Sequence, residues 1–196
     1  DNSGINVTPG TRPRVYYKRS TDGNVWNDNT NGTDGWKYAE ATNGTSPFNF
    51  DIDYALLNGG TGVIVGNNVQ YFVVAQDLAG TPNVAINSGT FALAPTSVAL
   101  TSTAFPIGGT INSYNIVAGL STSLTVGAAG TYPTITGVGG LFSDINANGL
   151  TGNTTVNILD ASVTETGAFG LNQTQSGGCA AAAFTLLIKP NAGVTT

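Results

Sequence analysis

The sequence Val69-Gln70-Tyr71-Phe72-Val73-Val74-Ala75-Gln76-Asp77 is the strongest structural signal in the chain. It is rich in β-branched and aromatic residues, which favour strands, and its centre is apolar on both faces of an extended backbone. A strand with two apolar faces must be covered on both sides, as a central strand of a β-sandwich is. We therefore predict a central antiparallel strand here.

Further strand signals lie on either side of this stretch. They are Arg14–Arg19, Trp36–Ala39, Phe48–Tyr54 and Val84–Leu93. From Phe48 to Tyr54 apolar and polar residues alternate without a break, which predicts a strand with one buried and one solvated face. The total is about five strands, whereas an immunoglobulin-like or fibronectin III-like sandwich has about seven. The predicted sandwich is therefore incomplete.

The composition excludes several kinds of chemistry. Only 9% of the 196 residues are charged, there is no His, and one Cys cannot close an internal disulfide. Without His the chain has neither a Ser-His nor a Cys-His nucleophile pair and no imidazole metal ligand. The net charge of -5, with six basic residues, argues against a nucleic-acid partner. No apolar run approaches the roughly 20 residues of a membrane span, so membrane insertion is not expected.

The second half predicts a different β unit. Its strand signals are Ser123–Val126, Thr154–Leu159 and Phe184–Pro190. Between them, apolar residues at helical spacing predict one short helix over Gly139–Ala147. We expect an all-β chain with a sandwich at residues 1–94, an extended Pro- and Gly-containing connector at 95–119 and the second unit at 120–196. No sequence repeat with a period of 20 to 50 residues is visible.

These segments resemble a known group of proteins. Pro13–Lys18, Phe50–Asp53, Val69–Asp77 and Pro82-Asn83 look like immunoglobulin-like modules of large secreted Bacteroidetes cell-surface proteins, many of them type IX secretion substrates and some adhesins. Gly130–Ile135 and Asp144–Leu150 look like the opening segment of a right-handed parallel β-helix of the pectate-lyase-like kind. The resemblance implies an extracellular or cell-surface location. A chain without methionine is also expected to be a processed product.

The turn-rich segment between the first two predicted strands holds the candidate binding residues. Oxygen-bearing side chains at near-alternate positions followed by Gly resemble a calcium loop, and the candidate ligands are Asp22, Asn27, Asn29, Asn31 and Asp34. Tyr38 stands where such a loop has its Glu, and an ordinary Asn/Gly turn is the alternative. Trp26 lies in the same segment and is the candidate for stacking on a sugar ring. No cofactor other than this calcium is expected.

Two other features have residue types that can carry chemistry. Asp51 and Asp53 lie two residues apart on one strand face, as paired carboxylates of a glycosidase do, and also as a solvated strand face does. Cys179 has no basic neighbour that would stabilise a thiolate and is expected to act as a small apolar residue. We expect no catalytic residue and no enzyme activity.

Three functions remain as hypotheses. The leading one is a non-catalytic structural or adhesive module of a secreted bacterial surface protein. The second is a subunit of an extracellular filament assembled by strand exchange, in which residues 92–117 of one copy complete the sandwich of another. The third is a carbohydrate-active enzyme or carbohydrate-binding module, supported by fold analogy. The expected partners are other copies, further domains of a longer chain, or a surface polysaccharide.

Overall fold

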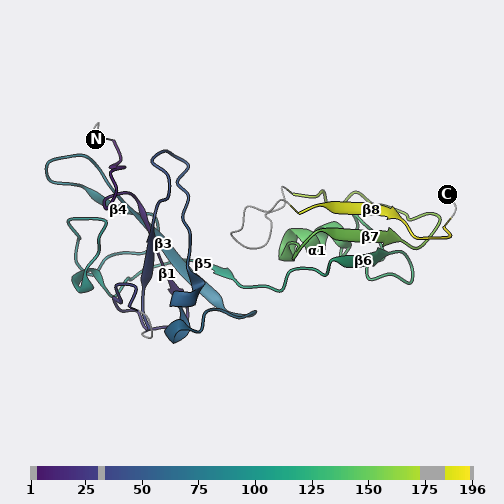
Figure 1. The fold of residues 1–196 in the computed structure, drawn as a ribbon, viewed down its shortest axis with the longest axis horizontal. Helices are drawn as coiled ribbons and strands as arrows, with labels where there is room; N and C mark the ends of the chain where they lie inside the picture. The colour runs from purple at the N-terminus through teal and green to yellow at the C-terminus, as the bar shows by residue number, and fades with distance from the viewer. Residues whose placement is uncertain (1–3, 31–33, 173–183, 195–196) are drawn as a thin grey trace. The chain divides into compact units, whose positions relative to one another are not determined.

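A computed structural model describes residues 4–30, 34–172 and 184–194. The chain divides into two compact units, Asp1–Ile116 and Val117–Thr196, and Figure 1 labels most of their strands. Both units are built mainly of β-structure, and the described residues contain one α-helix, in unit 2. The chain is thus all-β in class, with an antiparallel sheet in unit 1 and a parallel sheet in unit 2.

Unit 1 is organised around one long strand. Its strands are β1 (Arg14–Arg19), β2 (Lys37–Glu40), β3 (Asn68–Gln76), β4 (Val84–Ile86) and β5 (Asn112–Asn115). The order across the sheet is β2-β1-β3-β4, and β5 also pairs with β3. β4 pairs with the end of β3 and β5 with its beginning, so β3 has partners along both edges. The prediction that this segment is a central antiparallel strand is confirmed.

The two faces of β3 contribute to two separate cores. Phe72 and Val74 belong to a cluster on one face that also holds Tyr16, Trp36 and Phe105. The alternate residues of β3 face the other way, and Val69 is buried there in a second cluster. Because side chains of a strand alternate between faces, a run that is apolar at successive positions supplies both clusters.

The segment expected to be an extended connector, residues 95–119, is different in the structure. Val98, Leu100, Ala104 and Ile107 are buried in the first cluster of unit 1, around the 3-10 helix η3 (Ser102–Ala104). The segment ends in β5, and the boundary between the units lies after residue 116. The prolines and glycines were correct indicators of turns, but the apolar residues between them cover a sheet face. Residues 92–117 therefore pack on their own copy.

Two strand predictions in unit 1 are wrong in extent. Residues 48–53 form no ladder, and the 3-10 helices η1 (Tyr54–Leu56) and η2 (Asn58–Gly60) follow them. Phe50 and Ile52 still pack on the second cluster, so the alternation of the sequence marks a covering segment without marking backbone pairing. The segment predicted over Val84–Leu93 is a strand only as β4.

Unit 2 contains a sheet of three parallel strands in the order β6-β7-β8. Its elements are β6 (Ser123–Val126), α1 (Leu141–Asn148), β7 (Thr154–Ile158) and β8 (Leu186–Pro190). Ser123 pairs with Thr155, and Thr155 pairs with Leu187, a step of 32 residues each time. The backbone path therefore repeats although the sequence does not.

The helix of unit 2 lies close to its predicted place. α1 begins after Gly140 and ends at Gly149, whose positive φ of 70° suits glycine. Leu141 and Ile145 are buried in the core of unit 2. Val138, which fits the same helical spacing, precedes the helix and is 83% exposed.

Candidate functional site

The loop between β1 and β2 carries all the predicted calcium ligands and Trp26. It is closed by a bridge between Trp26 and Trp36 and by the hydrogen bond from Trp36 N to Val25 O, 2.9 Å long. Gly35 makes this closure possible, because a Cβ on it would lie 2.5 Å from Val25 O and its φ is 114°. The loop is thereby folded back against the end of β2.

The centre of this loop is the ammonium group of Lys37. The side chain leaves only 1% of its surface exposed. Its Nζ donates to Asn27 Oδ1 and, over 3.0 Å, to Thr30 O. Asn27 is held from its other end, since its Nδ2 donates to Asp34 O over 2.8 Å. Burial lowers the pKa of Lys37, and the charges of Asp22 and Asp34 oppose that shift.

A second buried ammonium lies at the start of the same loop. Lys18 Nζ donates to the carbonyls of Arg19 (3.1 Å) and Asp22 (3.0 Å), and lies 5.3 Å from the ring centre of Trp36. The Asp22 carboxylate accepts from the Arg19 guanidinium over 2.6 and 3.0 Å. Burial lowers the pKa of Lys18, and the charge of Asp22 raises it. Asp22 is therefore ion-paired with Arg19, and its charge also acts on both lysines.

The remaining predicted calcium ligands do not share one environment. Asn29 pairs with the backbone of Tyr38, accepting from its N over 2.7 Å and donating to its O over 2.9 Å. Asp34 is exposed, and Asn31 lies outside the described residues. Within the described ranges, no three His, Cys, Asp or Glu side chains group as a metal site would require. Among the predicted ligands it is Asn27 whose side-chain oxygen accepts from the Lys37 ammonium, a cation of the chain itself. Calcium binding stays a prediction.

Sequence reasoning missed Lys37 as the centre of the loop. The available signal was its position between Trp36 and Tyr38 on a predicted strand, directly after an Asn-rich loop. A lysine on a strand next to two aromatic residues is more readily assigned to the solvated face. Only the fold shows that the loop carbonyls reach its ammonium.

Trp26 belongs to an aromatic cluster. Its ring lies 6.0 Å from Tyr38 and 5.6 Å from Phe105, both stacked, and 6.0 Å from Tyr16. The Arg14 guanidinium lies 4.5 Å above the Tyr38 ring. Trp26 is half-buried by these contacts, which pack it on the core of unit 1. Contact with a sugar stays a prediction.

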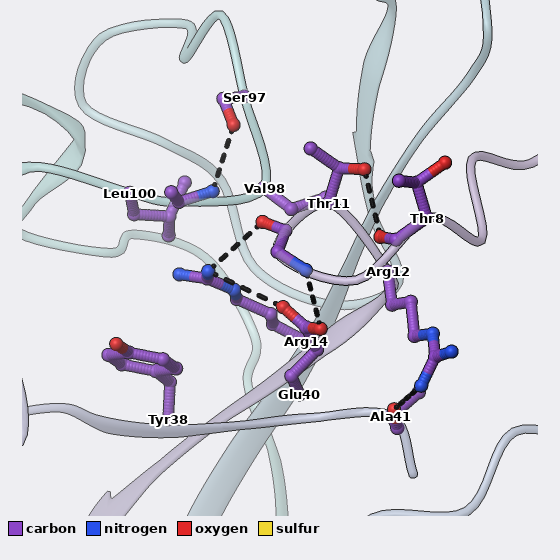
Figure 2. Close-up of polar contacts among 12 residues, drawn as sticks. Thr8, Thr11, Arg12, Arg14, Tyr38, Glu40, Ala41, Ser97, Val98 and Leu100 are labelled. Carbon is purple, nitrogen blue, oxygen red and sulfur yellow. Dashed lines mark hydrogen bonds and ion pairs between the residues drawn. The ribbon is translucent and has the colours of Figure 1, made fainter. Parts of the chain in front are cut away.

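The Arg14 side chain also connects the sheet to the preceding loop. Figure 2 shows it beside Tyr38, close to the carboxylate of Glu40 and to the loop that carries Thr11. Its Nη2 donates to Gly10 O over 3.2 Å and lies 3.5 Å from Glu40 Oε2, while Gly10 N donates to Glu40 Oε1 over 2.8 Å. Arg14 and Glu40 thus fix this loop on β1 and β2.

The paired aspartates lie outside this loop. Asp51 and Asp53 are both exposed, and Asp53 Oδ1 caps η1 by accepting from Ala55 N over 2.9 Å. Cys179 lies outside the described residues. No helix in the described part of the chain is long and apolar enough to cross a membrane.

The chain was compared with protein-family models, curated proteins and solved structures. No protein-family model, curated protein or solved structure matches the chain.

Proposed function

We propose that the chain is a non-catalytic structural or adhesive module of a secreted bacterial surface protein. The observation that carries the proposal is the use of its carboxylates. Side chains of this kind accept hydrogen bonds that hold the chain's own loops, in the pairs Glu40 with Gly10, Asp53 with Ala55, Asp77 with Ala79, Asp160 with Ala128 and Glu165 with Thr136. Carboxylates committed to loop backbones stabilise a scaffold, whereas catalytic carboxylates face a substrate.

The architecture of unit 1 supports an immunoglobulin-like sandwich that is only partly built. One face of its antiparallel sheet carries a large aromatic cluster, as the inner face of a sandwich does, and a second cluster covers the other face. Toward the end of β3 one face opens into a shallow groove lined by Ile5, Ala75, Asp77 and Ala85. We attribute this groove to strands that a complete sandwich would have there.

The architecture of unit 2 supports the opening coils of a right-handed parallel β-helix. Its parallel strands are joined by the same 32-residue step twice, and each coil packs on the next. α1 packs against the inner row of these strands through Leu141 and Ile145.

The proposal is tested with the purified chain and with cells that produce it. We expect the chain to release no reducing ends or unsaturated sugars from pectin, arabinan, xylan or chitin. We also expect cells from which it is deleted to attach less to polysaccharide-coated glass. Turnover of any of these polysaccharides, or unchanged attachment of the deletion cells, would contradict the proposal.

A second candidate, a filament subunit, is favoured by the last strand of unit 2. Leu124, Val156 and Ile188 form one inward row across β6, β7 and β8, and they are 5%, 0% and 36% exposed. The row therefore loses its cover at β8. An uncovered apolar strand at a sheet edge is a site of association.

A further inference from the structure

The contact between Lys37 and Asn27 joins two groups that can react with each other. A lysine amine is a nucleophile in its neutral form, and a carboxamide carbon is an acyl centre. Lys37 Nζ donates to Asn27 Oδ1, the atom bonded to Asn27 Cγ, so the amine nitrogen lies beside the acyl carbon. Both residues are buried, Lys37 in β2 and Asn27 in the preceding loop.

The surroundings hold the reacting groups in place. Asn27 cannot rotate freely, because its Nδ2 donates to Asp34 O over 2.8 Å. Lys37 is oriented by its bond to Thr30 O over 3.0 Å. Fixing an amine against an acyl carbon replaces an encounter in solution with an intramolecular step, which is worth several orders of magnitude in rate.

We propose that Lys37 and Asn27 form an intramolecular isopeptide bond. Nζ of Lys37 attacks Cγ of Asn27, the Nζ–Cγ bond forms, and the Cγ–Nδ2 bond breaks. One proton passes from Nζ to the departing nitrogen, which leaves as ammonia, and no oxidant, reductant or other reactant is consumed. The cross-link covalently closes the loop from residue 27 to residue 37.

The local chemistry supports each part of this step. Burial lowers the pKa of Lys37, which makes the neutral amine more accessible than that of an exposed lysine. The carboxylates of Asp22 and Asp34 lie close enough for their charges to act on Lys37, and a carboxylate of this kind can carry the proton. The nitrogen that departs, Asn27 Nδ2, donates to the backbone carbonyl of Asp34, which is an exposed residue.

A cross-link here goes beyond the proposed function and also explains why such a polar loop is sequestered at the sheet. The chain has one Cys and cannot stabilise itself by an internal disulfide. A covalent bond between the loop and edge strand β2 would keep the loop attached to the sheet when the chain is pulled, as disulfides stabilise other extracellular domains.

The test is the intact mass of the full purified chain. We expect it to be lighter than the mass calculated from its sequence by one ammonia molecule. Proteolysis should then yield a branched peptide, and its fragmentation in the mass spectrometer should locate the link between residues 27 and 37. A mass equal to the sequence mass would overturn the proposal and leave Lys37 as a caged ammonium.

Variants separate this cross-link from other losses of ammonia. Lys37→Arg keeps the positive charge but cannot form the bond, so the sequence mass should return. Asn27→Asp should lose water in place of ammonia. Asn29→Ala removes another amide of the same loop and should keep the ammonia loss. Persistence of the loss in Lys37→Arg would indicate a cyclised asparagine elsewhere and would overturn the proposal.

Discussion

Tyr16 shows how much of unit 1 depends on one hydroxyl. Its OH donates to Val98 O over 2.5 Å and accepts from Leu100 N over 2.9 Å, and the ring is fully buried beside Phe72. These two bonds attach the segment before η3 to β1, more than 80 positions away in the sequence. Together with the bonds of Gln76 to Val98 and of Asn24 to Ile107, they make the expected connector part of the core.

Replacing Tyr16 by Phe should therefore destabilise unit 1. The change removes two buried hydrogen bonds and leaves Leu100 N and Val98 O only their mutual bond of 3.1 Å, which costs about 1–3 kcal/mol in all. Urea unfolding followed by tryptophan fluorescence measures the effect, because both tryptophans, Trp26 and Trp36, lie in unit 1. The control is Tyr71→Phe on β3, whose hydroxyl has no hydrogen bond to the described residues; it should change stability by less than about 0.5 kcal/mol. Equal effects of the two changes would contradict the role given to Tyr16.

Tyr17 predicts a loss of stability at high pH. Burial raises the pKa of Tyr17 from 10.0 to about 12. Between these values the unfolded chain has released the phenolic proton and the folded chain has kept it, so the free energy of unfolding falls as pH rises. Urea midpoints of unit 1 at pH 9, 10 and 11 should decline accordingly. Tyr17→Phe should make the decline shallower without removing it, because burial also raises the pKa of Tyr16. An unchanged slope in Tyr17→Phe would reject this assignment.

At the scale of elements, the loop between β1 and β2 depends on Gly35. An alanine there would place its Cβ 2.5 Å from Val25 O and adopt a φ of 114°. Backbone strain of this kind costs about 1–3 kcal/mol, and the clash adds to it by disturbing the bond from Trp36 N.

We expect Gly35→Ala to lower the stability of unit 1 by at least about 2 kcal/mol. Gly66→Ala is the matched control, because Gly66 also has a positive φ, 92°, but nothing lies within 4 Å of its Cβ position. It should show the strain alone and a clearly smaller loss. Fluorescence-detected urea unfolding measures both. Equal losses would mean that the Val25 carbonyl moves without cost.

In unit 2 the Glu165 carboxylate holds two segments of the chain together. It accepts from Ile135 N (2.7 Å), Thr136 N (2.6 Å) and Thr136 Oγ1 (2.5 Å), and so holds one coil beside the other. Burial would raise the pKa of Glu165, but the three hydrogen bonds outweigh it and the pKa is lowered. Its contribution to stability is therefore present above the ordinary pKa of 4.5 and is lost as pH falls through the lowered value.

Glu165→Ala should reduce the acid sensitivity of unit 2 and also its stability at pH 7. Far-ultraviolet circular dichroism in urea at pH 7 and pH 3 is the measurement, with the tryptophan signal of unit 1 as the internal reference. Asp51→Ala, an exposed carboxylate of unit 1, serves as the control and should leave both values unchanged. A Glu165→Ala chain with the same pH dependence as the parent would show that the hydrogen bonds of Glu165 do not stabilise unit 2.

The elements also show what the sequence could predict. Apolar patterns located β1, β3 and α1 within a few residues, because local periodicity and burial agree there. Periodicity failed at residues 48–53, where the alternating side chains pack on a core while the backbone has no ladder partner. It also failed at residues 98–107, which cover a sheet that is distant in sequence. Among candidate site residues the loop was found, but its central cation was not, because no local pattern shows that Lys37 points inward.

At the scale of the whole molecule, the two units cover the apolar faces of their sheets in different ways. Unit 1 covers both faces of its sheet with irregular segments, Phe50–Leu57 on one side and residues 98–107 on the other. Unit 2 covers its strands by stacking coils. The inward row of unit 2 ends at Ile188, where the described residues provide little cover.

This difference predicts that the chain associates through β8. Burying the exposed part of an apolar row gains roughly 25 cal/mol per Å² of apolar surface, and a strand edge adds backbone hydrogen bonds. Sedimentation velocity of the full chain should show oligomers at micromolar concentration, in which β8 of one copy meets a partner copy. Ile188→Lys places a charge on the inward row and should shift the chain to monomer. Leu187→Lys is the control on the opposite face of the same strand, where the side chain is 53% exposed, and should leave association largely intact. A parent chain that sediments as a monomer, or equal effects of the two lysines, would show that the inward row of β8 is not the contact.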